Sequence, residues 1–333
     1  FTALLHHIDE DLLNRSFFKL KKTAAVGVDG VTWFEYERDL EANLKDLHGR
    51  IHRGSYRAKP SRRSWIPKPD GRKRPLGIAS LEDKIVQRAV VEVLNAIYEV
   101  DFLGFSYGFR PGRGQHDALD ALTVGIETQA VNWILDADIK GFFDNISHEW
   151  MMKLVEHRIG DRRMLRLIRK WLKVGVVEDG VRHPAERGTP QGSVISPLLA
   201  NIYLHYVHDL WVEQWRRRHV RGAMIVVRYA DDTVVGFEHK ADAERFLAEL
   251  RERPDHALHR AMPSLDLVFT YGGGPPVVAS YEGFGARRCV PNWSAHWHWC
   301  LTTRPRPPRT TPPTTSCSLP TRPLASRRSR CRH

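Results

Sequence analysis

The 333-residue sequence predicts an α+β fold in which helices back an antiparallel sheet. Apolar residues recur at helical spacing over residues 34–52 and 81–99, which indicates two amphipathic helices. Residues 65–78 and 223–237 each read as two strands around a short turn, and residues 131–139 alternate as a further strand. Because hairpins join neighbouring strands in opposite directions, we expect the sheet to be antiparallel.

Further helices complete this pattern along the chain. Ser147 is predicted to cap one of them, because a serine side chain accepts a hydrogen bond from the first helical turn. Ser196 and Pro197 are predicted as the N-cap and first residue of another, since the first helical position needs no N–H donor. These helices are expected at residues 1–25, 115–130, 148–173, 196–215 and 241–253.

The composition of the chain changes near residue 253. Residues 254–286 are punctuated by glycine and proline, and residues 287–333 are rich in Arg, Pro, Thr and Ser without one acidic residue. The second segment cannot bury enough apolar surface to offset its ordering entropy, so we predict disorder. Its ten arginines carry most of the net charge of +12 and leave only +2 for residues 1–286. Its four cysteines lack the spacing of zinc ligands.

Two groups of carboxylates carry the chemical signal. In the strand WILDADI, residues 133–139, Asp136 and Asp138 fall on the face opposite the core-facing residues. Taken alone, Asp138 is better explained as an exposed strand end. In the hairpin VVRYADDTVV, however, Asp231 and Asp232 are adjacent, and two like charges repel unless a cation lies between them. Strand and turn together could hold two Mg²⁺ ions about 4 Å apart, as phosphoryl transfer requires.

Five blocks, taken in order, resemble a known family. They read IPKPDGRKRPLGI at residues 66–78, FSYGFRPGRGQHDAL at 105–119, DIKGFFDNI at 138–146, GTPQGSVISPLLANIY at 188–203 and YADD at 229–232. They are similar to the fingers hairpin, the block that follows it, and polymerase motifs A, B and C of the reverse transcriptases encoded by group II introns. YADD alone is a weak signal, but five blocks in order over residues 1–253 are specific.

The resemblance implies the catalytic centre. Asp138, Asp231 and Asp232 would be the catalytic residues and would hold two Mg²⁺ ions, together with the backbone carbonyl of Ile139. The residues support this reading, because carboxylate and carbonyl oxygens are the ligands that Mg²⁺ prefers.

The resemblance also implies substrate contacts. The incoming deoxynucleoside triphosphate (dNTP) would be contacted by Lys68, Arg74, Phe143 and Gln191. Phe143 would exclude a ribose 2′-hydroxyl, while Lys68 and Arg74 supply the positive charge that a triphosphate needs. The primer and template would be contacted by Arg110, Arg113 and Tyr229. The loop around these two arginines mixes aromatic residues, Arg and Gly, which suits a nucleic-acid strand.

The family pattern predicts the domain organisation. The fold would be a right-hand polymerase without its thumb, made of an N-terminal helical extension of the fingers, the fingers, the palm with motifs A, B and C, a degraded end of the palm and a disordered basic tail. The corresponding residues are 1–50, 51–130, 131–253, 254–286 and 287–333. The break after residue 253 indicates a truncation or a shifted reading frame, which the neighbouring frame of the source DNA would test. A chain without a thumb is expected to extend primers poorly.

The predicted function is RNA-directed DNA polymerisation in group II intron mobility, with dNTPs, an intron RNA template and a DNA primer or target as partners. Two alternatives remain open, namely an RNA-binding splicing maturase cofactor and an inactive remnant of a mobile element. Retron and diversity-generating reverse transcriptases are related possibilities that the fingers and motif A blocks disfavour. We expect a cytoplasmic protein, because the sequence has no export signal and no apolar run long enough for a membrane span. Its oligomeric state is left open.

Overall fold

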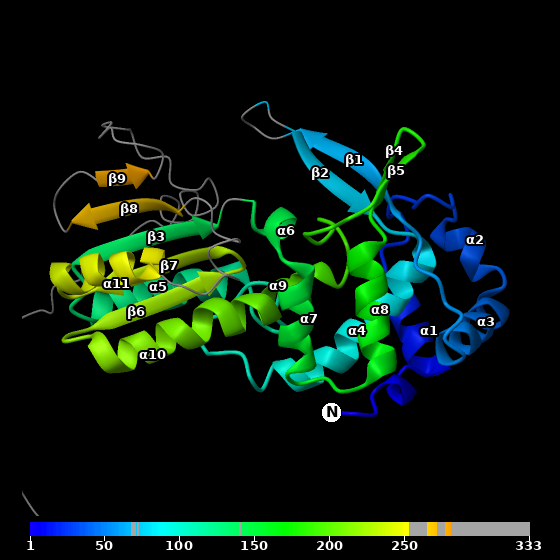
Figure 1. The fold of residues 1–333 in the computed structure, drawn as a ribbon, viewed down its shortest axis with the longest axis horizontal. Coiled ribbons are helices and arrows are strands. Elements are labelled where there is room, and N and C mark those ends of the chain that lie inside the picture. Colours follow the sequence, from blue (N-terminus) through cyan, green and yellow to red (C-terminus); the bar gives the residue numbers. More distant parts are fainter. Residues whose placement is uncertain (68–70, 72, 140, 253–264, 272–276, 281–333) are drawn as a thin grey trace, which may run out of the picture. The chain divides into compact units, whose positions relative to one another are not determined.

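The computed structural model describes residues 1–67, 71, 73–139, 141–252, 265–271 and 277–280 (Figure 1). This part of the chain forms two β-sheets together with the helices that join their strands, which confirms the predicted α+β class. The two sheets carry different sets of the predicted motifs. The fingers hairpin is in the first sheet, and motifs A and C are in the second.

The first sheet has the strand order β2-β1-β4-β5. Strands β1 (Ser61–Pro67) and β2 (Lys73–Ile78) are antiparallel, as the fingers hairpin predicts. Strands β4 (Val176–Glu178) and β5 (Val181–His183) form a second small hairpin, which the sequence analysis did not identify. Strands of three residues are too short for a readable alternation.

The second sheet is antiparallel, with the order β6-β7-β3-β8-β9. It contains the strands β3 (Trp133–Ile139), β6 (Met224–Tyr229), β7 (Asp232–Phe237), β8 (Leu265–Tyr271) and β9 (Val277–Ser280). The last two strands were not expected, because weak periodicity marked residues 254–286 as a degraded end of the palm. In the structure β8 pairs with β3 along its whole length, so β3 is a central strand.

Helices α5 and α11 pack against the second sheet, whereas the β1–β2 hairpin of the first sheet projects away from the helices (Figure 1). The predicted helix at residues 34–52 is divided at Arg38 and Asp39, where Asp39 leaves helical geometry. Before residue 130 the helices are η1 (Leu5–His7), α1 (Glu10–Phe18), α2 (Trp33–Glu37), α3 (Leu40–His52), α4 (Leu81–Tyr98) and α5 (Gln115–Thr128). After it they are α6 (Phe142–Asn145), α7 (His148–Glu156), α8 (Arg162–Lys173), α9 (Ser196–Leu204), the π-helical turn η2 (His205–Asp209), α10 (Leu210–His219) and α11 (Lys240–Glu252).

The helix starts test two predictions about capping. Ser147 caps α7 as predicted, because its hydroxyl accepts a hydrogen bond from the Trp150 amide. Helix α9 begins one residue earlier than predicted, so Ser196 is its first residue and Ile195 is the N-cap. The Ser196 hydroxyl donates to the Pro190 carbonyl at 3.1 Å, which ties the first turn of α9 to the preceding loop.

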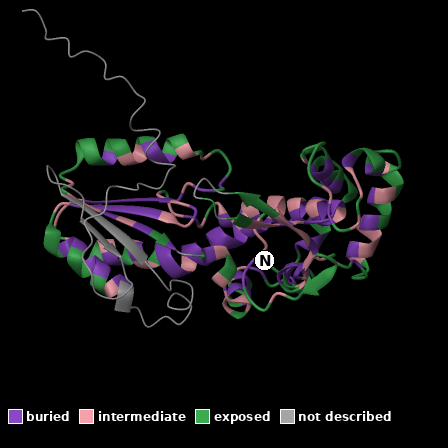
Figure 2. Cartoon of the chain, turned by 90° about the horizontal axis from the view of Figure 1, so that it is seen from above, coloured by how far each residue is buried: buried purple, intermediate pink, exposed green. Residues whose placement is uncertain are grey.

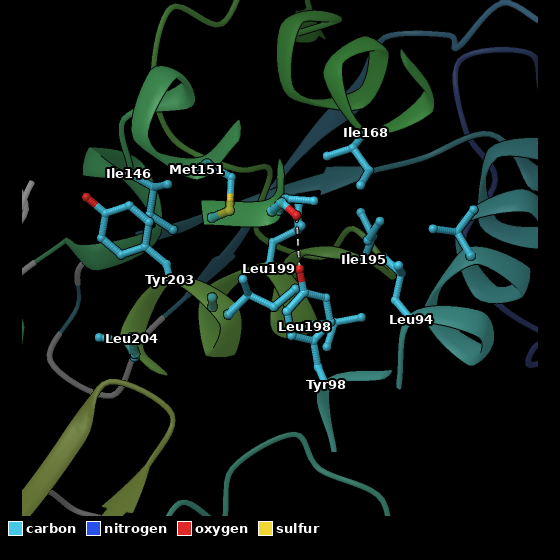
Figure 3. Packing of buried hydrophobic residues seen from close by; sticks show 14 of the residues in the cluster. Leu94, Tyr98, Ile146, Met151, Ile168, Ile195, Leu198, Leu199, Tyr203 and Leu204 are labelled. Atoms are coloured by element: carbon cyan, nitrogen blue, oxygen red, sulfur yellow. Dashed lines mark hydrogen bonds between the residues drawn. The ribbon is translucent and has the colours of Figure 1, made fainter. Parts of the chain in front are cut away.

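The core of the helical part lies where α4, α7, α8 and α9 meet (Figure 3). Leu94, Met151, Ile168 and Leu199 are fully or almost fully buried there, and the Tyr98 hydroxyl donates to the Val155 carbonyl at 3.3 Å. In the second sheet, β6 and β7 are buried along most of their length (Figure 2). Such packing fixes the ends of these strands, where the candidate site residues are found.

Candidate active site

The register of the second sheet brings the three predicted catalytic carboxylates together. Strands β3 and β7 pair Ala137 with Thr233, and the next step of this antiparallel register places Asp138 level with Asp232. Cβ atoms of such cross-strand neighbours are about 5 Å apart. The β6–β7 hairpin leaves Ala230 and Asp231 as its two turn residues. The strand and turn acids therefore occupy one edge of one sheet.

The predicted alternation of β3 is confirmed. Leu135, Ala137 and Ile139 are buried, whereas Asp138 is exposed and Asp136 is half-buried. Asp138 and Asp136 therefore share the face that looks away from the core. Ile139 is the last residue of β3, so its carbonyl oxygen belongs to the same edge of the sheet.

The carboxylates act on one another electrostatically. Burial raises the pKa of Asp232 to about 7, and the negative charges of Asp231, Asp138 and Asp136 add to this shift. Burial and the charge of Asp138 raise the pKa of Asp136 to about 6. The pKa of Asp231 is also raised by burial and Asp138, although Arg74 opposes the shift. A cluster of this kind favours the bound state of a cation, which neutralises the shared charge.

The donor set fits hard divalent cations. Carboxylate and carbonyl oxygens are the ligands that Mg²⁺ takes in proteins, usually with retained waters and substrate phosphates. Within the described ranges, no three His, Cys, Asp or Glu side chains are drawn together closely enough to enclose an ion by themselves. A site completed by water and substrate phosphates does not require three side chains to enclose the ion.

Three of the four predicted dNTP contacts lie side by side. Arg74 on β2 donates from Nε to the Gln191 side-chain oxygen at 3.1 Å, and the Gln191 amide lies 3.5 Å from a carboxylate oxygen of Asp144. Phe143 is the neighbour of Asp144 in α6 and is partly packed against the core. Arg74 also acts electrostatically on Asp231. The fourth predicted contact, Lys68, is outside the described residues.

The loop that carries Gln191 is held by backbone contacts. The Thr189 amide donates to the Phe143 carbonyl at 2.7 Å, so this loop is docked against motif A. Gly188 has φ +81°, and a Cβ atom there would lie 2.9 Å from the Phe143 and Asp144 carbonyl oxygens. Only glycine combines this conformation with this close approach.

Two further residues of the site were not found by sequence reasoning. Gln87 is buried in α4, and its side-chain oxygen accepts hydrogen bonds from the Ser193 hydroxyl at 2.8 Å and the Val194 amide at 3.0 Å. It therefore supports the loop of Gln191. Arg228 is fully buried beside the hairpin turn. The signal for Arg228 was present in the sequence, because a charge inside an apolar strand needs a partner.

The structure corrects one predicted nucleic-acid contact. The Arg110 guanidinium is buried and donates to the carboxylate of Glu99 and the carbonyl oxygens of Leu103 and Ser106, so it holds its own loop together. Arg113 is half-buried over the Tyr107 ring. Tyr229 is half-buried at the end of β6 and lies 6.5 Å from Phe109 between ring centroids.

An antiparallel sheet with acidic residues at its edge, beside a basic hairpin, is typical of nucleic-acid polymerases. The chain belongs to the reverse transcriptase (RNA-dependent DNA polymerase) family, whose model matches residues 66–256. It is related to group II intron-encoded proteins. Among the described residues, no helix is both long and apolar enough to cross a membrane.

Two curated relatives, YkfC and LtrA, support the assignment. Protein YkfC of Escherichia coli (strain K12) is 36% identical over 255 residues, which cover 68% of this chain and 67% of YkfC. The group II intron-encoded protein LtrA of Lactococcus lactis subsp. cremoris is 44% identical over 166 residues, which cover 50% of this chain but 27% of LtrA. The chain thus spans about two thirds of one relative and about a quarter of the other. A solved structure of apo telomerase from Candida Tropicalis aligns with a TM-score of 0.49 at 10% identity, over 72% of this chain and 58% of that one.

Proposed function

We propose that the chain is an RNA-directed DNA polymerase of the group II intron type, which transfers a nucleotide from a dNTP to a primer 3′-hydroxyl. The observation that carries the proposal is the β3–β7 register, which ends at Ala137 and Thr233 and so leads directly to Asp138 on one strand and to Asp232, the neighbour of Asp231, on the other. Two Mg²⁺ ions bound there would activate the 3′-hydroxyl and stabilise the leaving pyrophosphate.

Each side chain has a defined part in this proposal. Asp138, Asp231 and Asp232, with the Ile139 carbonyl, supply the oxygen ligands for the two ions. Arg74 is already oriented by Gln191, and its positive charge acts on the carboxylate of Asp231. It is therefore suited to bind triphosphate oxygens. Lys68 is proposed as a second cation for the triphosphate.

Sugar selection is assigned to Phe143. Its backbone carbonyl is fixed by the Thr189 amide, and its ring packs edge-on against Phe142 with centroids 5.6 Å apart. A ring held in this way could exclude the 2′-hydroxyl of a ribonucleotide by contact. Gln191, which Arg74 orients, is proposed to lie beside the nascent base pair.

The partners proposed for the chain are an intron RNA template and a DNA primer or target. Helix α8 offers a surface for phosphates, because its exposed side carries cations and this helix contains no acidic residue. Arg169 pairs with Glu156, but Arg166, Lys170 and Lys173 have no carboxylate partner in the part of the chain that the structure describes. Burial, and to a lesser extent the nearby charges of Arg166 and Arg57, lowers the pKa of Lys170.

The alternatives are an RNA-binding splicing cofactor and an inactive remnant. Purified full chain is assayed for primer extension on an RNA template with dNTPs and Mg²⁺, alongside the Asp231→Asn variant. The proposal requires that the wild type extends the primer and that Asp231→Asn loses extension while it keeps RNA binding. Asp179→Asn, an exposed turn residue on the β4–β5 hairpin, is the matched control and retains extension.

The outcomes separate the three interpretations. Equal extension by wild type and Asp231→Asn would refute the metal assignment. RNA binding without extension by the wild type would favour the splicing cofactor, and the absence of both would favour the remnant.

A further inference from the structure

A fully buried arginine lies directly behind the carboxylate-bearing turn. Arg228 is the penultimate residue of β6, and its side chain is 0% exposed. Its five N–H groups all have acceptors. Nε and Nη2 donate to the two carboxylate oxygens of Asp209 at 2.7 and 2.6 Å. Nη2 also donates to the Ser106 hydroxyl at 2.7 Å. Nη1 donates to the Asn201 side-chain oxygen at 3.2 Å and to the Ala230 carbonyl at 2.6 Å.

The partner charge is provided by an irregular helix. Asp209 is also 0% exposed and lies in the π-helical turn η2 between α9 and α10. Burial raises the pKa of Asp209, but the charge of Arg228 and the hydrogen bond to His208 outweigh it and bring the pKa to about 2. The sequence predicts a regular helix through this segment. The π-helical turn shifts the residues that follow it around the helix axis, and such turns are frequent at functional sites.

The bond to Ala230 acts on the metal-binding turn itself. Ala230 has φ +57°, a left-handed conformation that a residue with a Cβ atom adopts only when its surroundings impose it. Its carbonyl is held by Arg228, and Asp231 is the next residue. Gly108 packs closely against the same turn, since a Cβ atom there would lie 2.2 Å from the Ala230 nitrogen.

The same network reaches two other parts of the site. The Phe105 carbonyl accepts from the Arg228 amide and the Arg228 carbonyl accepts from the Tyr107 amide, both at 2.8 Å. The Asn201 amide donates to the Gly108 carbonyl at 2.7 Å. Arg228 therefore joins the loop at residues 105–108 and the motif B helix to the turn of motif C.

We propose that Arg228 is a positioning residue that fixes the left-handed turn at Ala230 and so aims Asp231 and Asp232 at the metal ions. This inference rests on the proposed metal site and adds a residue to which neither the sequence motifs nor the site chemistry assigned a role. The competing explanation is an ion pair that only stabilises the fold. Buried ion pairs can often be replaced by apolar residues of similar volume without loss of stability, so the two explanations can be separated.

The decisive variant is the double substitution Arg228→Met/Asp209→Leu in the full chain. It removes both buried charges together and leaves neither unpaired, while the Ala230 carbonyl loses its donor. The matched control is Arg50→Met/Glu82→Leu, which removes another ion pair, with a 2.6 Å contact between α3 and α4, that does not contact the turn. Both proteins are compared with the wild type by thermal melting, by hydrogen exchange of the peptide that spans the turn, and by Mn²⁺ titration followed by electron paramagnetic resonance without nucleic acid.

The positioning role predicts a folded double variant with faster exchange at the turn and Mn²⁺ affinity about tenfold weaker or more, while the control matches the wild type in both. Wild-type exchange at the turn in a folded double variant overturns the proposal. If the double variant does not fold, Arg228→Lys decides on the same criteria, because lysine keeps the charge beside Asp209 but cannot supply five donors in a fixed plane.

The proposed metal site is tested separately from the role of Arg228. If Asp231→Asn binds Mn²⁺ as tightly as the wild type, the metal assignment is wrong, and the exchange measurement still decides whether Arg228 fixes the turn.

Discussion

At the scale of single residues, the carboxyl group of Asp232 combines a proposed catalytic role with a cost to stability. Its pKa of about 7 exceeds the ordinary value of 3.8 because of burial and of three neighbouring acids. The folded state therefore holds the proton more tightly than the unfolded state, and this group destabilises the metal-free fold increasingly as pH rises from about 4 to about 7. The raised pKa of Asp136 works in the same direction.

Asp232→Asn is expected to stabilise the metal-free protein while it abolishes polymerisation. Asparagine stays neutral, so the melting temperature at pH 7.5 should rise by on the order of 5 °C, with a smaller gain at pH 5. Thermal melts at both pH values in the presence of a chelator measure the effect, with Asp179→Asn as the control. A gain that does not depend on pH would contradict the electrostatic explanation.

At the scale of elements, Gly188 lies where the motif B loop contacts α6, and Gly180 provides a matched control position for its substitution. Gly188 and Gly180 have nearly the same backbone angle, with φ of +81° and +79°. A Cβ atom at Gly188 would meet the Phe143 and Asp144 carbonyls at 2.9 Å, whereas one at Gly180 would meet nothing within 4 Å. The two positions therefore share the conformational cost of a side chain and differ only in the contact.

Gly188→Ala is expected to raise the KM for dNTP and to lower stability more than Gly180→Ala does. The added methyl group should push the motif B loop away from α6 and move Gln191 relative to Arg74. Steady-state primer extension and thermal melting of the two variants provide the comparison. Equal effects of the two substitutions would show that backbone strain alone, and not loop docking, is responsible.

Helix α8 leads to a second prediction at this scale. Arg166→Gln/Lys173→Gln should weaken RNA binding and reduce the slope of log affinity against log salt by about 1.4, because two phosphate contacts are lost. The control Lys153→Gln/Arg217→Gln removes the same charge from residues that already pair with Glu149 and Glu213. If both pairs of substitutions reduce the slope equally, α8 is not a specific contact surface.

At the scale of the whole molecule, stability should depend on pH and Mg²⁺ together. The raised pKa values of Asp136, Asp231 and Asp232 make the metal-free fold lose stability as pH rises from about 4 to about 7. The lowered pKa of Asp209 contributes stability that is present above its ordinary value of 3.8 and is lost as pH falls toward about 2. The combined contribution of these four carboxyl groups to metal-free stability should therefore be most favourable near pH 4 to 5.

Bound Mg²⁺ should offset the loss of stability that occurs as pH rises from about 4 to about 7. Ions bind the ionised carboxylates of the folded state, so the gain in melting temperature on adding Mg²⁺ should be larger at pH 7.5 than at pH 5. Differential scanning fluorimetry over this range with and without Mg²⁺ tests the prediction, and Asp231→Asn should reduce the gain. An equal gain at both pH values would point to binding elsewhere.

The amino-acid sequence by itself determined the fold class, the family motifs and the alternation that turns Asp138 away from the core. These features are local, because they depend on spacing of two or of three to four residues and on turn residues. It also indicated which residues could bind metal, since adjacent carboxylates in a hairpin turn need a cation.

Only the tertiary structure decided which residues support that site. The side-chain partners of Arg228 are Asp209, Asn201 and Ser106, which are 19, 27 and 122 positions away, and no local pattern specifies such pairs. The same is true of β8, whose place beside β3 depends on long-range pairing, and of Arg110, whose burial removed it from the predicted nucleic-acid contacts. Burial and non-local hydrogen bonding are properties of the packed chain. The sequence could therefore predict candidate metal ligands, but the contacts that hold them in place became evident only in the folded structure.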